Sequence, residues 1–360
     1  MPESPSVSPS VSGEECLSSW TTLRVGGAAA TFVEVDTDDD LIAVVHDCDL
    51  RAEPVLLIAG GSNLVVGDEG FGGTVVKIAT QGIRVEKATD GTGYAVLATV
   101  AAGESWDRLV AQMVADSYSG IETLSGIPGS VGATPIQNVG AYGNEVSQSL
   151  ESVEVYDRTE NRRSVLLADD CGFGYRASAF KRDRERWLIL RVTFRLERRV
   201  DSVPIHYAEL AKKLHVSQGD PAPLEEVRRG VLAVRRNKGM VLDIDDFDTW
   251  SVGSFFTNPI VKESAVLAVP AHAPRWPTVD GHVKFSAAWL IEHAGFAKGY
   301  RVFDQAPASI STKHTLALTN RGAATASDII ELAAAIRRGV QHEFGVDLEP
   351  EPRLINCALS

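Results

Sequence analysis

Apolar side chains recur along this chain at spacings that predict alternating strands and helices. Short continuous apolar runs at 55–58 (VLLI) and 94–103 (YAVLATVAAG) predict buried strands, and further strands are predicted at 151–157 and 187–196. A helix is predicted after the second run, because apolar residues recur there at helical spacing at Trp106, Leu109, Val110, Met113 and Val114. We interpret this stripe as core packing and not as part of a cofactor site.

Capping residues predict where other helices begin and end. Thr37 and Thr325 each precede an aspartate by three positions, which is the spacing of a capping signature. Ser286 is a further predicted N-cap, and Gly345 is a predicted helix stop. Two more helices are predicted from apolar positions at Leu210 and Leu214 and then at Leu224, Val227, Val231 and Val234.

The order of these elements predicts a folded chain of three lobes after a tail. Residues 1–19 begin with a stretch rich in Ser and Pro and are expected to be a disordered tail. Residues 20–85 and 86–199 are expected to form two successive lobes that mix strands and helices. Beyond residue 199 helices dominate at first, so 200–360 is expected to be a separate, smaller α+β domain.

Composition excludes several classes of protein. The chain has 360 residues and a formal net charge of −13, which disfavours nucleic acid as a partner. No run approaches the roughly 18 apolar residues of a membrane span, and the amino-terminal stretch lacks the basic and apolar regions of a signal peptide. The four cysteines are scattered without metal-ligand spacing: Cys16, Cys48, Cys171 and Cys357. We therefore expect a cytoplasmic protein without a metal site or a disulfide framework.

Two glycine-rich stretches carry the candidate binding chemistry. Residues 125–143 (SGIPGSVGATPIQNVGAYG) hold no charged residue, and residues 60–63 (GGSN) interrupt an apolar strand that resumes at Leu64. Turns rich in glycine can present backbone N–H groups to phosphate oxygens. The second stretch is not a dinucleotide-binding GxGxxG motif, because β-branched residues follow it where that motif would open a helix. A plain surface loop remains the alternative for 125–143 on composition alone.

Together these stretches resemble the UDP-N-acetylenolpyruvoylglucosamine reductase family, from about Leu23 to Ile355. The resemblance rests on separate motifs in order: LRVGGAA (23–29), AGGSNLVV (59–66), residues 125–143, GYRASAFK (174–181), GSFFTNPIV (253–261), SAAWLIEHAG (286–295) and LEPEPRLI (348–355).

The resemblance implies an α+β (α/β) fold, cofactors and a reaction. It implies a two-lobed FAD-binding domain of the vanillyl-alcohol-oxidase type, followed by a smaller substrate-binding domain. It also implies non-covalent FAD, NADPH as co-substrate, and reduction of the enolpyruvyl ether of a UDP-sugar to UDP-N-acetylmuramate for peptidoglycan. We expect a monomer or a weak homo-oligomer, although the sequence does not fix the oligomeric state.

The resemblance also implies roles for individual residues. Arg176, Ser254 and Glu351 match the family's catalytic positions, whereas Tyr175, Tyr207, Lys238 and Asn258 match substrate contacts. Tyr207 is expected to lie on a loop that folds over the substrate. The expected cofactor-binding residues are Gly60, Gly61, Ser62, Asn63, Leu64, Ser125, Gly126, Ile127, Pro128, Gly129, Gly132, Gln137, Asn138, Gly140, Ala141, Tyr142 and Gly143.

The chemistry of an enolpyruvyl ether explains why such residues are needed. Hydride can add to the terminal CH2 only if the negative charge that develops on the carboxylate side is stabilised, and a proton must then reach the carbon that bears the ether oxygen. Arg176 is the predicted cation, because a guanidinium is always charged and can hold a carboxylate through two bonds. Ser254 is the predicted proton donor. Glu351 is the third position, with the nearby Glu349 as a decoy, and its protonation state is left open.

Three alternatives stay open at this point. The cluster Arg228, Arg229, Arg235, Arg236 and Lys238 can be a solvated helix face as well as a phosphate site. The chain can also be another flavoenzyme of the same fold, for example an oxidase of small alcohols. The third alternative is a nucleotide-binding protein without activity.

Overall fold

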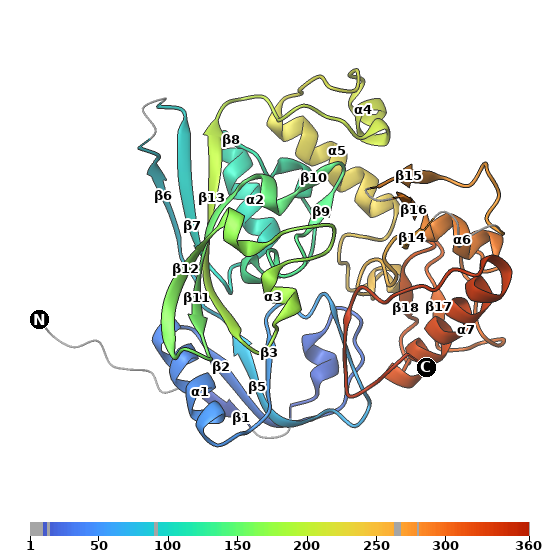
Figure 1. Cartoon of the computed structure of the whole chain (residues 1–360), viewed down its shortest axis with the longest axis horizontal. Coiled ribbons are helices and arrows are strands. Elements are labelled where there is room, and N and C mark those ends of the chain that lie inside the picture. The colour runs from blue at the N-terminus through green and yellow to red at the C-terminus, as the bar shows by residue number, and fades with distance from the viewer. Residues whose placement is uncertain (1–9, 13–14, 90–92, 263–267, 279–280, 360) are drawn as a thin grey trace, which may run out of the picture. The chain divides into compact units, whose positions relative to one another are not determined.

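The computed structural model describes residues 10–12, 15–89, 93–262, 268–278 and 281–359 (Figure 1). The chain divides into two compact units. Unit 1 comprises Met1–Glu15, Ala29–Gly60 and Gly72–Arg235, and unit 2 comprises Cys16–Ala28, Gly61–Phe71 and Arg236–Ser360. Each unit is therefore assembled from segments that are far apart in the sequence.

The larger sheet of unit 1 has, within the described residues, six strands that pair antiparallel. Its order is β12 (Arg162–Leu167), β11 (Leu150–Asp157), β13 (Trp187–Arg198), β7 (Ala95–Ala101) and β6 (Ile83–Lys87), with the short β8 (Tyr118–Ser119) also paired to β13. Helix α2 (Trp106–Ala115) covers it, and all five residues of the predicted stripe are buried. The indole of Trp106 lies 5.6 Å from the Phe194 ring, between centroids. The prediction of core packing for this helix is confirmed.

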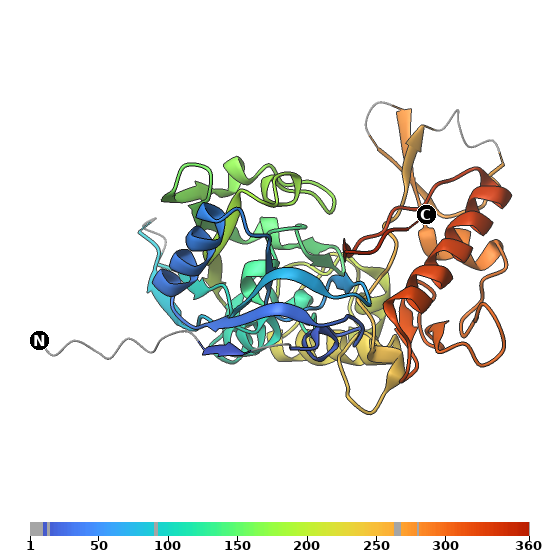
Figure 2. The ribbon, with the colours of Figure 1, turned by 90° about the horizontal axis from the view of Figure 1, so that it is seen from below.

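A smaller sheet completes the amino-terminal part of unit 1. Its order is β1 (Ser10–Ser12), β2 (Ala29–Val35), β5 (Phe71–Ile78) and β3 (Val55–Ile58), with β3 parallel to β5. Helix α1 (Asp38–Leu50) begins at Thr37, whose side chain accepts the N–H of Asp40, as the capping signature predicts. Leu41 and Val45 of α1 pack in one apolar cluster with residues of β2, β3 and β5, and Figure 2 shows the helix along this sheet.

The remaining elements of unit 1 are short apart from one helix. They are η2 (Glu122–Leu124), η3 (Val131–Ala133), β9 (Gly140–Ala141), β10 (Asn144–Glu145), η4 (Val146–Gln148), η5 (Ala168–Cys171), α3 (Ala179–Arg182), α4 (Ala208–Leu214) and α5 (Leu224–Asn237), the last of which ends beyond the unit boundary. The described structure therefore differs from the expected boundary at residue 200, because 200–235 belong to unit 1. Leu224 joins the core of the larger sheet, and Arg228 pairs with Asp107 of α2.

Unit 2 is built around one long helix and small sheets. Helix α7 (Ala326–Phe344) packs with α6 (Ala287–His293) in the apolar core of this unit. The other elements are η1 (Leu17–Trp20), β4 (Leu64–Val66), η6 (Phe247–Thr249), β14 (Ile260–Lys262), β15 (Arg275–Pro277), β16 (His282–Phe285), β17 (Ala308–Ile310), β18 (Leu318–Asn320) and β19 (Arg353–Ile355). Strand β19 pairs parallel with β4, which joins the end of the chain to its beginning.

The predicted caps of unit 2 are confirmed. Ser286 accepts the N–H of Trp289 at the start of α6, and Thr325 forms a capping box with Asp328 at the start of α7. Gly345 ends α7 with φ +68°, in the left-handed conformation that favours glycine.

The predicted disordered tail is wrong for part of residues 1–19. Ser10–Ser12 forms β1, which pairs antiparallel with β2, because the edge of β2 offers backbone partners. Leu17–Trp20 forms η1, and the Leu17 side chain is fully buried, since an apolar residue there completes a core. Residues 1–9 and 13–14 lie outside the described residues.

The described residues contain neither a membrane-spanning helix nor a metal-binding cluster. No helix among them is both long enough and apolar enough to cross a membrane. In the same part of the chain, no group of His, Cys, Asp or Glu side chains is arranged to hold a metal ion.

Candidate active site

Arg176 occupies a strained position in a tight turn of unit 1. The turn is closed by two backbone hydrogen bonds, from Gly174 N–H to the Ala177 carbonyl at 3.0 Å and from Ala177 N–H to the Gly174 carbonyl at 3.2 Å. Within this turn Arg176 has φ +51°, a left-handed conformation that is uncommon for residues other than glycine. Lys181 donates to the Arg176 carbonyl at 2.9 Å. Strain of this kind persists only where the surroundings fix it, and it concentrates at functional positions.

Hydrogen bonds hold this turn against the glycine-rich loop 125–143. The Arg176 guanidinium donates to the carbonyl of Gly140 at 2.9 Å and to that of Asn138 at 3.5 Å. The Asn138 side chain donates to the Gly174 carbonyl at 3.2 Å, and Ser178 donates to the Ile136 carbonyl. The glycine-rich loop therefore fixes the direction of the Arg176 side chain, which the sequence motifs do not reveal.

Several predicted cofactor ligands in this loop have structural roles. The Asn138 side chain is buried, donates to Glu145 at 2.8 Å and accepts the N–H of Ser147 at 3.0 Å. The buried Ser125 hydroxyl donates to the Glu122 carbonyl at 2.7 Å. The N–H groups of two predicted phosphate ligands are also bonded within the protein, Gly126 to Asp107 at 2.6 Å and Gly132 to the Ala102 carbonyl at 2.9 Å. These side chains and N–H groups form hydrogen bonds within the protein, and these bonds stabilise the conformation of the loop.

Asp107 and Arg228 form a pair that sequence reasoning missed. The Arg228 guanidinium binds both carboxylate oxygens of Asp107, at 2.7 and 2.9 Å, and Asp107 also accepts the N–H of Gly126. Burial alone would raise the pKa of Asp107, but the hydrogen bonds from Arg228 and Gly126 hold it below its usual value. The carboxylate therefore stays charged and fixes the start of the glycine-rich loop. Because Arg228 is engaged by Asp107, we no longer count it among the candidate phosphate-binding cations of this helix.

Tyr142 links the same loop to Tyr207. The two rings meet edge to face with 5.3 Å between centroids. Burial raises the pKa of Tyr142 to about 12, although the hydrogen-bonded Arg235 opposes this shift. Tyr142 therefore stays protonated at neutral pH. Tyr207 is 40% exposed, so part of its ring is open to solvent.

Gly60 and Gly129, one from each predicted phosphate loop, approach each other within unit 1. A Cβ atom added to Gly60 would lie 2.6 Å from the Cα atom of Gly129, which is closer than real Cβ contacts. Because both contacting groups are backbone, no side-chain rotation can relieve such a clash. The glycines here bring two uncharged turns together. Their chemistry suits the diphosphate of FAD, and the predicted ligands Ile127, Pro128, Gly129, Gln137, Ala141 and Gly143 stay predictions.

Gly60→Ala is expected to weaken FAD binding by about tenfold or more, because separating the two turns costs on the order of 1–3 kcal/mol. Flavin absorbance after gel filtration measures the retained cofactor. Gly72→Ala is the control, since a Cβ atom at Gly72 meets nothing within 4 Å. Equal flavin retention by the two variants would contradict the proposed close approach.

Ser254 and Glu351 come together within unit 2. Ser254 forms an isolated antiparallel bridge with Ala317, and the next residue, Phe255, donates its N–H to the Leu316 carbonyl at 2.7 Å. The N–H of Glu351 donates to the Phe255 carbonyl at 2.8 Å. The rings of Phe255 and Phe256 are fully buried and anchor this segment. The structure thus places two predicted catalytic residues on adjacent, backbone-paired segments.

Asn63 joins the same group. Its side chain donates to the Glu351 carbonyl at 3.5 Å, and its carbonyl accepts the N–H of Arg353 at 2.9 Å. Parallel pairing of Leu64 with Arg353 continues this contact into β4 and β19. Glu351 is half-buried, whereas the decoy Glu349 is exposed. A predicted cofactor turn and a predicted catalytic glutamate are therefore neighbours in unit 2.

The predicted substrate residues are divided between the units. Tyr175 and Tyr207 belong to unit 1, with Arg176, whereas Lys238 and Asn258 belong to unit 2, with Ser254 and Glu351. Asn258 accepts the N–H of Ala287 at 2.9 Å through its side-chain oxygen. That bond fixes the orientation of its amide group.

Known proteins are similar to this chain over nearly its whole length. The family profile described as "UDP-N-acetylenolpyruvoylglucosamine reductase, C-terminal domain" matches residues 245–355, and the one described as "FAD binding domain" matches residues 29–163. The UDP-N-acetylenolpyruvoylglucosamine reductase of Salinispora arenicola is 52% identical, with 96% of this chain and 96% of the relative covered. The protein of that name in Cutibacterium acnes is 50% identical, with 95% of this chain and 90% of the relative covered.

A solved structure extends this likeness to the fold. The crystal structure of UDP-N-acetylenolpyruvylglucosamine reductase from Thermus caldophilus is 27% identical, with a TM-score of 0.65. It covers 96% of this chain and 99% of its own. The relatives are about 50% identical to this chain over nearly its whole length. The pairing of the Ser254 and Glu351 segments agrees with this likeness. This chain belongs to the UDP-N-acetylenolpyruvoylglucosamine reductase family.

Proposed function

We propose that this protein reduces the enolpyruvyl ether of UDP-N-acetylglucosamine-enolpyruvate to UDP-N-acetylmuramate, with FAD as its cofactor and NADPH as co-substrate. Its family membership supports this reaction, and the FAD-binding match over residues 29–163 supports the cofactor. The observation that carries the proposal is the pairing of the Ser254 and Glu351 segments. When bound, FAD accepts hydride from NADPH and supplies it to the double bond.

Arg176 is the proposed cation for the carboxylate side of the substrate. Its guanidinium donates to the neutral carbonyls of Gly140 and Asn138, and these two bonds orient it. A fixed cation stabilises charge that develops during the reaction without reorganising at that moment. Tyr175, whose ring centroid lies 5.5 Å from the Arg176 guanidinium carbon, is proposed to steady this group.

Ser254 is the proposed proton donor to the carbon that bears the ether oxygen. A serine hydroxyl is a weak acid, so it needs neighbours that stabilise its alkoxide or replace its proton. Glu351 lies on the segment that pairs with Phe255. It is proposed either to orient the Ser254 hydroxyl or to return a proton to it after donation. The buried side chains of Phe255 and Phe256, which follow Ser254, anchor the backbone of this segment.

The remaining contacts are proposed to recognise the UDP-sugar. Lys238 suits the diphosphate as a point charge, and Asn258 offers an amide of fixed orientation. The partly exposed Tyr207, whose ring rests on Tyr142, is proposed to close over the substrate. A cytoplasmic location and a monomeric or weakly associating state stay predictions from the sequence.

One spectroscopic experiment tests the proposed function. The purified protein is expected to be yellow, to bleach on anaerobic addition of NADPH, and to regain its absorbance on addition of the enolpyruvyl nucleotide. Slow recovery of the flavin absorbance in air would distinguish a reductase from an oxidase of the same fold. A yellow protein that NADPH never bleaches would support the alternative of a binding protein without activity. Acid precipitation is expected to release the flavin, because no tethering residue is proposed. Colourless protein that cannot be reconstituted with FAD would contradict the proposal.

A further inference from the structure

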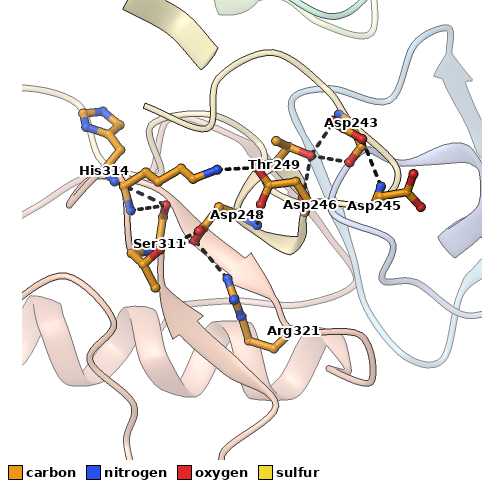
Figure 3. Close-up of polar contacts among 10 residues, drawn as sticks. Asp243, Asp245, Asp246, Asp248, Thr249, Ser311, His314 and Arg321 are labelled. Atoms are coloured by element: carbon orange, nitrogen blue, oxygen red, sulfur yellow. Dashed lines mark hydrogen bonds and ion pairs between the residues drawn. The ribbon is translucent and has the colours of Figure 1, made fainter. Parts of the chain in front are cut away.

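Asp248 is a buried carboxylate to which the proposed mechanism assigns no role. It lies in η6 of the loop that joins Lys238 to Ser254, and it is 4% exposed. Asp243, Asp245 and Asp246 of the same loop are more exposed. Figure 3 shows these side chains together with Asp248. A buried carboxylate is retained only where hydrogen bonds and charge compensate its loss of solvation.

The compensating partners of Asp248 come from one turn and one strand end. Thr312 donates its N–H at 2.8 Å and its hydroxyl at 2.6 Å, and the Arg321 guanidinium donates at 2.9 Å. Ser311 also donates its hydroxyl to this carboxylate. Figure 3 shows Asp248 between Ser311 and Arg321. Although burial opposes the charged form, these bonds hold the pKa of Asp248 below its usual value.

The turn that Asp248 holds leads directly to Ser254. Ser311 Oγ accepts the N–H groups of Lys313 and His314, at 3.0 and 3.2 Å, which sets the shape of the turn. The His314 carbonyl in turn accepts the N–H of Ala317, the bridge partner of Ser254. A continuous series of hydrogen bonds, through side chains near Asp248 and through backbone near Ala317, therefore connects Asp248 to the segment of the proposed proton donor.

Asp248 also contacts the segment that carries Lys238. A Cβ atom added to Gly239 would lie 2.9 Å from the Asp248 carbonyl oxygen and 3.2 Å from its Cβ atom. Gly239 has φ +65° and follows Lys238 directly. The backbone at Asp248 thus packs against the neighbour of one proposed substrate contact, while its carboxylate fixes the turn that pairs with Ser254.

We infer that Asp248 is a positioning residue that sets the placement of Ser254 for proton donation and supports the backbone beside Lys238. This inference rests on the proposed function, because it concerns the step in which the nucleotide is reduced. Displacement of a reacting group by about 1 Å can cost up to about a hundredfold in rate. Asp248 contacts neither reacting atom in this scheme, so its effect passes through the turn.

The test is anaerobic stopped-flow of the FAD-loaded full-length protein, with Asp248→Asn compared to wild type. The amide cannot accept all the bonds of the carboxylate and does not balance Arg321, so the turn is expected to shift. Re-oxidation by the enolpyruvyl nucleotide is expected to slow by about tenfold, with a higher half-saturating concentration. Bleaching by NADPH is expected to stay within about twofold of wild type. A role in stability alone would not confine the loss to one phase.

Asp245→Asn is the matched control, because it removes the same charge from an exposed position of the same loop. Thr312→Val serves if Asp248→Asn does not fold, since it removes one hydrogen bond to Asp248 from an exposed residue. It is expected to slow the nucleotide phase by about threefold.

Unchanged nucleotide phases, or equal slowing of both phases, would overturn the inference and leave the proposed function intact. Failure of the wild-type protein to be re-oxidised by the nucleotide would instead refute the proposed function, and the inference with it.

Discussion

Replacement of Ser254 by alanine is expected to leave flavin bleaching by NADPH nearly normal and to stop re-oxidation by the enolpyruvyl nucleotide almost completely. The first phase needs hydride transfer to the flavin and no proton from Ser254. The second phase needs a proton at the carbon that bears the ether oxygen, and general acid catalysis typically contributes about a hundredfold or more. Stopped-flow flavin absorbance follows both phases in one experiment.

The alanine variant is expected to fold, because the pairing of Ser254 with Ala317 involves backbone groups. Ser254→Cys is the informative companion, since a thiol can also donate a proton and is expected to restore part of the second phase. If Ser254→Ala slowed bleaching by NADPH and left the nucleotide phase unchanged, Ser254 would not be the proton donor. Glu351, on the paired segment, would then be the better candidate.

Arg176→Ala is expected to lower kcat by about a hundredfold, which corresponds to roughly 3 kcal/mol of lost stabilisation of developing charge. Lys238→Ala is expected chiefly to raise KM, because a diphosphate contact acts equally on bound substrate and transition state. Steady-state kinetics with the enolpyruvyl nucleotide measures both constants. Together the two variants separate chemistry from binding.

Arg182→Ala is the matched control for Arg176. Arg182 also donates to a loop carbonyl, that of Gly172 at 3.1 Å, and it lies six residues further along the chain. Its removal is expected to leave both kinetic constants within about twofold of wild type. A change in KM alone for Arg176→Ala would show that this guanidinium binds substrate without stabilising the developing charge.

The local elements of this protein could be predicted well from the sequence. The apolar stripe of α2, the capping box at Thr325 and the stop at Gly345 all depend on residues within a few positions of one another. Such signals are local because a helix places residues three and four apart on one face. The apolar runs that form β3 and β7 are similarly self-contained.

The candidate site was predicted by motif, but its supporting contacts were not. Asn138 was expected to bind the cofactor, whereas its buried amide holds Gly174 and Glu145. In the sequence, Arg228 was one of several cations in a charged stretch. Only the fold showed that it forms an ion pair with Asp107, which is 121 residues away in the sequence. No periodicity encodes such a partner, because the partner depends on which elements the topology brings together.

The sequence by itself determined the family, and it predicted the candidate residues of the reaction together with local elements such as α2, α7, β3 and β7. Only the tertiary structure decided that Glu351 pairs with the segment after Ser254, that the Arg176 turn rests on Gly140, and that Asp248 supports the turn from Thr312. The physical reason is that secondary structure and motif chemistry arise from neighbouring residues. Hydrogen bonds between distant segments exist only once the burial of apolar side chains has fixed the path of the whole chain.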